Sequence, residues 1–318
     1  MNYDKSDMLH VLEAFPAQCK DAVKLVRGFK IPKKKYSNIC VCGMGGSGIG
    51  GELLKPLAKK QEIITHHDYG LPNKVNSKSL VIVVSYSGNT EESLSAFTEA
   101  KKRKAKVVSI TSGGKLAEKD KQAIIIPSGY EPRAAIGYLF LTIVAVLSNN
   151  KLIPNQSSSI SEAIKLLDAK ITSRIAFLLA KKIIGTIPIY YINGEIGAVA
   201  YRMKTQINEN SKQPGFYHVF PEMNHNEILG FKRLGKKVTA VFILDSKDPV
   251  KIKKRMDITK KLIKNQTNVE EIQVKGKSLL ARMLTTIYVG DLTSYYLALM
   301  NKEDPTPIPL INELKKKL

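Results

Sequence analysis

The chain has 318 residues, 43% hydrophobic and 25% charged, and this globular composition and length favour two domains of roughly 150 residues. No apolar run approaches the roughly 18 uncharged residues that a membrane-spanning helix needs, so we expect no membrane partner. The formal net charge of +22 comes from lysine-rich clusters spread along the chain, which favours a solvated basic surface over the alternative, a nucleic-acid site.

Helical apolar spacing mixed with charge predicts a first helix over residues 6–27 and argues against a signal peptide. The three cysteines, Cys19, Cys40 and Cys42, are too few for a disulfide framework, and no His/Cys cluster has metal-ligand spacing. Cys40 and Cys42 are expected to face the same side of a strand as small core residues. We therefore expect a cytoplasmic protein that holds no metal.

The first half of the chain alternates strand-like apolar runs with turns and helices. A strand over 37–43 leads into a glycine-rich turn and a helix from about residue 50. The other expected elements are strands over 62–68, 79–85, 106–114 and 122–129 and a helix over 90–105. The run at 79–85 is continuously apolar, as in parallel strands covered on both faces. This alternation predicts a doubly wound α/β sheet.

The second half repeats this pattern after a polar, proline-containing run over 148–163. Because this composition is typical of a linker, we place the boundary near residue 150, with domains 1–150 and 151–318. The expected strands are 187–194, 236–245 and 269–275, and the expected helices are 195–212, 252–266 and 278–300, before a proline-punctuated tail. Two α/β halves of similar length suggest an internal structural repeat.

The stretch GMGGSG at residues 43–48 follows the first strand and has the G-x-G-x-x-G spacing of a dinucleotide-binding loop. Asp68 lies near the place of a ribose-binding acid, so a nicotinamide cofactor is one interpretation. The strand before Asp68 ends in the polar residues His66 and His67, which weakens that interpretation. We predict strand-edge positions for these two histidines, and the sequence identifies no partner for them.

Three hydroxyl side chains, Ser85, Ser87 and Thr90, surround a Gly-Asn turn at the end of the next expected strand. The following helix starts here, so its unpaired N–H groups and positive dipole end point at the same place. Ser47 of the glycine-rich turn approaches from the neighbouring strand. The alternative is a simple helix cap by Ser87 or Thr90, but a cap needs one hydroxyl rather than four. The pattern favours a site for a terminal phosphomonoester.

The segment SYSGNTEE resembles the phosphate loop of the sugar isomerase (SIS) domain. Together with GMGGSGIGG, YEPRAAIGY, KTQINENSK, PEMNHNEI and the tail DPTP…ELK, it makes both halves resemble the bifunctional phosphoglucose/phosphomannose isomerases. The resemblance implies an α/β protein of two SIS-type doubly wound subdomains, with parallel sheets flanked by helices. It also implies that the glycine loop, including Gly46, holds a sugar phosphate and binds no nicotinamide, so no cofactor is expected.

The implied reaction is aldose–ketose isomerisation of hexose 6-phosphates, in which a proton moves between C1 and C2 through a cis-enediol. It would interconvert glucose 6-phosphate, and by the same chemistry mannose 6-phosphate, with fructose 6-phosphate. The resemblance assigns the role of base to Glu209, which composition alone would treat as an ordinary solvated helix residue.

His225 is one of five histidines, and the resemblance assigns ring opening to it. Its neighbours Asn224, Asn226 and Glu227 are expected to orient the imidazole. A loop histidine with satisfied hydrogen bonds is the alternative. In the family this histidine reaches the site from the neighbouring subunit, which implies a homodimer with shared sites.

Arg133 and Lys315 complete the implied site. The planar, permanently charged Arg133 suits the developing enediolate or a substrate oxygen, whereas a surface salt bridge is the alternative. Lys315 matches the family's terminal lysine, although three lysines run together here and a solvated basic tail is equally compatible. Ile308 stands where the family has a threonine seven residues earlier, with Thr306 nearby.

Two other functions are compatible with an SIS resemblance. One is a different SIS isomerase, acting on an amino-sugar or pentose phosphate. The other is a sugar-phosphate-binding regulator, but such proteins usually carry a helix-turn-helix module, for which the opening 30 residues are too short.

Overall fold

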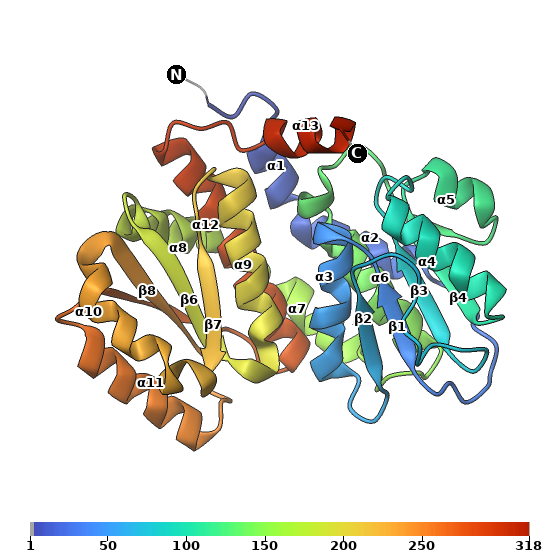
Figure 1. The fold of residues 1–318 in the computed structure, drawn as a ribbon, viewed down its shortest axis with the longest axis horizontal. Helices are drawn as coiled ribbons and strands as arrows, with labels where there is room; N and C mark the ends of the chain where they lie inside the picture. The colour runs from blue at the N-terminus through green and yellow to red at the C-terminus, as the bar shows by residue number, and fades with distance from the viewer. Residues whose placement is uncertain (1–2, 318) are drawn as a thin grey trace. The chain divides into compact units, whose positions relative to one another are not determined.

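The computed structural model describes residues 3–317 apart from the side chain of Lys316, so this side chain and Leu318 of the expected tail lie outside the described residues. The chain forms two compact units (Figure 1). The N-terminal unit comprises Ala14–Ile164, and the C-terminal unit combines residues 3–13 with residues 165–317. Each unit contains a parallel sheet flanked by helices, which confirms the predicted α/β class.

The single helix expected over 6–27 is two helices, α1 (Met8–Glu13) and α2 (Phe15–Leu25). Pro16 lies in the first turn of α2, and it lacks the N–H that a continuous helix would need at that position. The break coincides with the boundary between the units. α1 packs against α12 (Leu279–Met300) and belongs to the C-terminal unit, whereas α2 belongs to the N-terminal unit.

The segment expected to link the domains is also structured. α7 (Ser157–Leu166) lies within it and buries Ile160 and Ala163. The contacts therefore divide the chain after Ile164, rather than near residue 150 as in the expected ranges 1–150 and 151–318.

The sheet of the N-terminal unit has five parallel strands in the order β2-β1-β3-β4-β5. They are β1 (Ile39–Cys42), β2 (Ile63–His66), β3 (Leu80–Val84), β4 (Lys106–Thr111) and β5 (Ile124–Ile125). The helices that follow are α3 (Gly45–Leu54), α4 (Glu91–Lys102), α5 (Gly114–Lys119) and α6 (Ile136–Asn149). α2 and α3 pack with α6 on one face, while α4 and α5 cover the other. Every residue of β1 and β3 is buried, because helices cover both faces of these strands.

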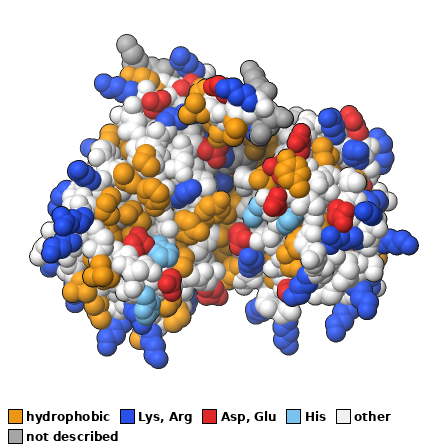
Figure 2. Space-filling view, in the orientation of Figure 1, with side chains coloured by type: hydrophobic (Ala, Val, Ile, Leu, Met, Phe, Trp, Pro, Cys, Tyr) orange, Lys and Arg blue, Asp and Glu red, His pale blue; other side chains and the backbone are white. Residues whose placement is uncertain are grey.

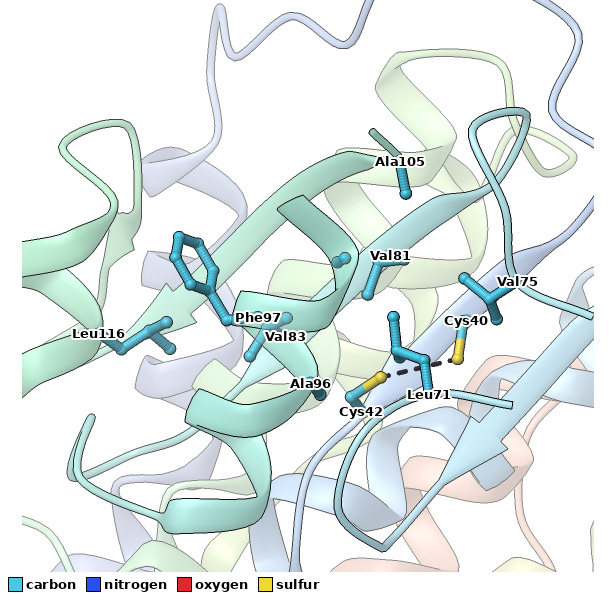
Figure 3. Close-up of a cluster of buried hydrophobic side chains, with 11 residues drawn as sticks. Cys40, Cys42, Leu71, Val75, Val81, Val83, Ala96, Phe97, Ala105 and Leu116 are labelled. Carbon is cyan, nitrogen blue, oxygen red and sulfur yellow. Dashed lines mark hydrogen bonds between the residues drawn. The ribbon is translucent and has the colours of Figure 1, made fainter. Parts of the chain in front are cut away.

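Figure 3 shows the core beneath α4. Cys40 and Cys42 point to the same side of β1, as predicted, and their sulfur atoms lie 3.6 Å apart in a cluster with Val81 and Val83. Both thiols are free and buried. The hydrogen bond to Cys40 and burial raise the pKa of the Cys42 thiol well above its usual value. The thiol therefore stays protonated and packs as a small hydrophobic group.

The sheet of the C-terminal unit has four parallel strands in the order β7-β6-β8-β9. They are β6 (Ile187–Asn193), β7 (Phe216–Phe220), β8 (Val238–Leu244) and β9 (Asn268–Gln273). The other helices are α8 (Ala169–Ile183), α9 (Gly197–Asn210), α10 (Phe231–Leu234), α11 (Val250–Ile263) and α13 (Pro309–Lys317). α12 packs against α8 and α9, and α9 lies along β6 and β7. In both units the second strand in the chain lies outside the first and the third lies on the other side, so the topology contains the suggested repeat.

β7 is a strand that its sequence does not predict. This strand is at the edge of its sheet, and Phe216 and Tyr217 are exposed, so it lacks the apolar run of a central strand. Its pairing with the buried β6 makes it a strand.

Within residues 3–317, no helix is both long enough and apolar enough to cross a membrane. The longest apolar run forms α6, which is buried along nearly all of its length. On the face shown in Figure 2, Lys and Arg side chains project from many separate places of both units.

Candidate active site

The predicted phosphate-binding residues lie where β1 and β3 end. These strands are neighbours in the sheet, but the chain leaves β1 toward β2 on one side and returns to β3 on the other. Open α/β sheets bind ligands at such a switch point, outside the carboxyl ends of the strands. Ser47 follows β1 and the segment 85–90 follows β3, so the topology brings the two loops together.

Hydrogen bonds join the two loops directly. The N–H of Tyr86 donates to Oγ of Ser47 at 3.1 Å, and this bond is buried. Oγ of Ser85 donates to Oγ1 of Thr90 at 3.1 Å, across the turn between β3 and α4. The hydroxyls of Ser47, Ser85 and Thr90 therefore all make hydrogen bonds within or to the turn between β3 and α4.

The alternative interpretation of a simple helix cap does not describe the hydroxyls in this turn. Thr90 occupies the N-cap position of α4, yet its side chain makes no capping bond to the helix. Oγ of the exposed Ser87 accepts from the N–H of Asn89 at 3.2 Å, inside the turn itself. The first turn of α4 therefore lacks a side-chain cap at the place where a phosphate would accept from its N–H groups.

Gly88 makes the sharp turn possible. Its φ is +71°, and a Cβ added to it would lie 1.8 Å from the carbonyl oxygen of Gly113. Any side chain here would both strain the backbone and separate the two loops, so the turn requires glycine.

Gly46 brings Arg133 to the glycine loop. A Cβ on Gly46 would lie 3.0 Å from the carbonyl oxygen of Pro132 and 3.1 Å from the backbone nitrogen of Arg133. The short helix that contains Arg133, Pro132–Ala134, therefore packs directly on the loop. The Arg133 side chain is only 3% exposed and pairs with Glu131 at 3.1 Å. This pair is partly buried, rather than the surface salt bridge that was the alternative for Arg133.

His67 also contacts the glycine loop, so the structure supplies a partner that the sequence did not identify. Its Nδ1 lies 2.7 Å from the carbonyl oxygen of Gly43, and its Nε2 lies 4.0 Å from Glu52. His66 is likewise paired, with the carbonyl oxygen of Tyr69 at 3.3 Å. No sequence pattern signals these contacts, because the partner atoms of Gly43 and Tyr69 belong to the backbone.

Glu209, the predicted base, lies in the last turn of α9 in the C-terminal unit, where it is partly buried. α12 fixes this end of the helix. Asn210 Nδ2 donates to Ser294 Oγ at 2.9 Å, and Ser211 Oγ donates to the Ser294 carbonyl oxygen at 2.7 Å. Both bonds are buried, so they hold the backbone that carries Glu209 in a defined position.

The C-terminal tail begins beside the same helix end. The ammonium of Lys212 donates to the carbonyl oxygens of Glu209 and of Pro305, the latter at 3.3 Å. Ile308, which replaces the family threonine, lies just before α13 and is partly buried. Lys315, the predicted terminal lysine, is exposed on α13.

His225 lies in the exposed 3₁₀ turn Glu222–His225 that follows β7. The neighbours expected to orient its ring are engaged elsewhere, so that expectation is wrong within one chain. Asn224 donates to Thr259 at 2.8 Å, and Asn226 donates to Glu222 at 3.4 Å.

The carboxylate of Glu227 instead fastens the His225 segment to the sheet. It accepts from the hydroxyl of Tyr191 and interacts with Nδ1 of His218, each at 2.5 Å. Tyr191 belongs to β6 and His218 to β7, and the two are paired in register. These contacts leave the position of the segment well defined while the His225 side chain stays exposed.

Glu209 and His225 of one chain lie at opposite ends of the C-terminal sheet. α9 leaves the carboxyl end of β6 and runs back to the amino end of β7, where Glu209 lies (Figure 1). His225 follows the carboxyl end of β7. α9 has 14 residues and so spans about 21 Å, which separates the two side chains widely.

The C-terminal unit has its own switch point, between β6 and β8, but its chemistry differs. Asn193 at the end of β6 donates to Asp248 at 2.8 Å, and Arg282 donates to Asp245 at 2.6 Å. Both aspartates are buried. The two units therefore share a topology but differ in the side chains at the switch point, with hydroxyls after β1 and β3 and buried carboxylates after β8.

Two separate family models match the two units of the chain. The SIS domain model matches residues 34–151, and the model described as "Bacterial phospho-glucose isomerase C-terminal SIS domain" matches residues 173–318. The protein is thus built from two SIS domains. It is 41% identical to the bifunctional phosphoglucose/phosphomannose isomerase of Caldicellulosiruptor bescii, over 95% of this chain and 96% of that protein. The chain belongs to the bifunctional phosphoglucose/phosphomannose isomerase family, which confirms the resemblance seen in its motifs.

A second sequence relative and a solved structure are also similar to this chain. The chain is 32% identical to a D-glucosamine-6-phosphate 4-epimerase of Sulfolobus acidocaldarius, over 96% of this chain and 97% of that protein. Its structure is similar to the C-terminal domain of glucosamine-fructose-6-phosphate aminotransferase from Francisella tularensis, with a TM-score of 0.75 and 13% identity, covering 96% of this chain and 99% of that chain. The second likeness concerns the fold alone.

Proposed function

We propose that this protein interconverts glucose 6-phosphate and mannose 6-phosphate with fructose 6-phosphate, without a cofactor. The proposal is carried by the gathered hydroxyls and the uncapped start of α4, in a chain that belongs to this isomerase family. Such a group suits the terminal phosphate of a hexose 6-phosphate. Three free cysteines support a reducing compartment, which we propose is the cytoplasm.

The reaction needs groups that act at the other end of the sugar. Glu209 removes the C2 proton of the open-chain aldose and returns it to C1, so the intermediate is a cis-enediol and the product is the ketose. The permanent charge of Arg133 stabilises the developing negative oxygen, and Lys315 supplies a second cation. His225 transfers the proton that opens the ring. Rotation about C2–C3 in the open-chain intermediate lets glucose and mannose phosphates share one enediol.

We also propose a homodimer in which His225 serves the active site of the neighbouring subunit. The wide separation of Glu209 and His225 within one C-terminal unit supports this arrangement, because one acid and one base must both reach the same sugar. Close to His225, Leu229 is 81% exposed, and an exposed large apolar side chain beside a functional residue favours a protein contact.

Mixing two inactive variants tests the shared site. Glu209→Gln and His225→Asn chains that exchange subunits are expected to recover about a quarter of wild-type activity, because half of the dimers are hybrids and each hybrid has one intact site. Activity is measured after exchange, and native mass spectrometry confirms the hybrids. As a control, Glu209→Gln is mixed with the Glu209→Gln/His225→Asn double variant, which leaves no intact shared site. Recovery no greater than in this control would assign both residues to one chain.

A substrate panel tests the function itself. One purified sample is assayed on glucose, mannose and glucosamine 6-phosphates, and the first two are expected to yield fructose 6-phosphate. Formation of a 4-epimer from glucosamine 6-phosphate alone would instead favour the activity of the epimerase relative. Binding of all three sugars without turnover would indicate a sugar-phosphate-binding regulator.

A further inference from the structure

Tyr86 lies in the middle of the phosphate-binding turn but faces the interior, and its side chain is only 6% exposed. Its backbone connects two loops. The N–H donates to Ser47 of the glycine loop, and the carbonyl oxygen accepts from the N–H and Oγ of Ser112, at 2.9 Å and 2.6 Å. The residue therefore links the loops that follow β1, β3 and β4.

The phenol of Tyr86 reaches a fourth segment. Its hydroxyl donates to the carbonyl oxygen of Pro127 at 3.0 Å and accepts from the N–H of Tyr130 at 2.8 Å. A phenol is the side chain that both donates and accepts here, so one oxygen fastens both ends of a four-residue stretch. Burial raises the pKa of this phenol, which keeps the donating proton in place.

The fastened segment leads directly to Arg133. It connects β5 to α6, and the helix Pro132–Ala134 that carries Arg133 begins two residues after Tyr130. Arg133 packs on Gly46 and pairs with Glu131, so the position of this segment fixes the position of the guanidinium. Tyr86 thus belongs to the phosphate-binding turn and also holds the segment that delivers Arg133.

We propose that Tyr86 is a positioning residue, whose phenol sets the distance between the bound phosphate and the Arg133 guanidinium. The inference rests on the proposed function, because it takes Arg133 as the cation beside the developing enediolate. The phosphate holds one end of the sugar and Arg133 acts at the other, so a change in their separation affects the reaction more than it affects binding.

The variant Tyr86→Phe removes only the hydroxyl and leaves the N–H of Tyr130 without its acceptor. We expect kcat/KM for glucose 6-phosphate to fall roughly 10- to 100-fold, mainly through kcat, since a displaced catalytic group slows the chemical step. Inhibition by inorganic phosphate is expected to change less than about threefold, because the hydroxyls that bind it remain.

Tyr36→Phe is the matched control. Tyr36 is 4% exposed in the same unit, and its hydroxyl donates to the carbonyl oxygen of Pro32 at 3.1 Å. Both variants lose a partly buried hydrogen bond from a phenol to a proline carbonyl oxygen, so a comparison of their melting temperatures shows how much of any effect is a general loss of stability. Equal kcat/KM values for Tyr86→Phe and Tyr36→Phe would overturn the proposal.

A double-mutant cycle separates positioning from general packing. In an Arg133→Ala background, Tyr86→Phe is expected to lower kcat/KM by less than about threefold, because the group that it positions is already absent. A loss as large as that in the wild-type background would mean that Tyr86 does not act through Arg133, and would also overturn the proposal.

Hydrogen exchange tests whether the Tyr86 hydroxyl holds the segment from Pro127 to Tyr130, and it needs no activity assay. The non-proline amides within residues 128–135 are expected to exchange at least tenfold faster in Tyr86→Phe than in Tyr36→Phe, because only the former frees this segment. Unchanged exchange would contradict the inference. If the wild-type protein failed to isomerise any hexose phosphate while this exchange result held, the proposed function would be wrong and the fastening role of Tyr86 would stand.

Discussion

Replacing Glu209 with glutamine is expected to lower kcat for glucose 6-phosphate by about 10³-fold, the scale of a lost general base. Glutamine keeps the size and helix preference of glutamate but cannot accept the C2 proton. The buried bonds that fix the end of α9 are made by Asn210 and Ser211, so they remain in the variant. The decisive measurement is exchange of the C2 hydrogen of the substrate with deuterium from solvent, which is expected to stop.

The control for this variant is Glu195→Gln. Glu195 is an exposed carboxylate beside the opposite end of α9, and we expect its replacement to leave kcat unchanged. Fructose 6-phosphate is expected to raise the melting temperature of both variants equally, because the phosphate-binding hydroxyls lie in the other unit. Hydrogen exchange at C2 that persists in Glu209→Gln would assign the base to another residue.

The hydroxyl-rich turn between β3 and α4 could be predicted from sequence because its chemistry is local. Ser85, Ser87 and Thr90 lie within six consecutive residues, and the strand before them and the helix after them are each readable from apolar spacing. Only Ser47 had to be placed by topology, and parallel strands bring their carboxyl ends to the same edge of a sheet. Hydrogen bonds join Ser85 to Thr90 and Ser47 to the backbone of Tyr86, while Ser87 bonds within the turn itself.

The contacts that position the other groups could not be predicted in this way. Tyr86 reaches Pro127 and Tyr130 across more than 40 residues of sequence, and its aromatic ring alone predicts only a core position. His67 contacts the backbone carbonyl oxygen of Gly43, and no sequence pattern encodes this contact. β7 is an exposed edge strand, so its identity depends on its partner rather than on its own composition.

The two halves also show why a fold does not define a site. Both sheets switch direction at the same place in their topology, yet the C-terminal switch point buries Asp245 and Asp248. Burial raises the pKa of Asp248, which reflects the cost of negative charge at that position. A repeat of the fold therefore need not repeat phosphate binding, and function follows from the side chains at the strand ends.

A negative charge in the turn between β3 and α4 provides the sharpest test of the proposed phosphate site. Ser87 is exposed, and its Oγ accepts only from the N–H of Asn89 in the turn. In Ser87→Asp the carboxylate can accept the same bond, so the turn and the start of α4 are expected to form normally. The carboxylate would face the phosphate dianion, and repulsion is expected to raise KM for glucose 6-phosphate at least about 100-fold.

The comparison variant is Ser77→Asp, which changes an exposed loop position of the same unit outside the turn between β3 and α4. It adds the same charge to the N-terminal unit, so any general effect of charge on a highly basic protein cancels between the two variants. Inhibition by inorganic phosphate is measured alongside KM, and it is expected to weaken in Ser87→Asp alone. If phosphate inhibited both variants equally, the anion would bind elsewhere, and the gathered hydroxyls would only shape the turn between β3 and α4.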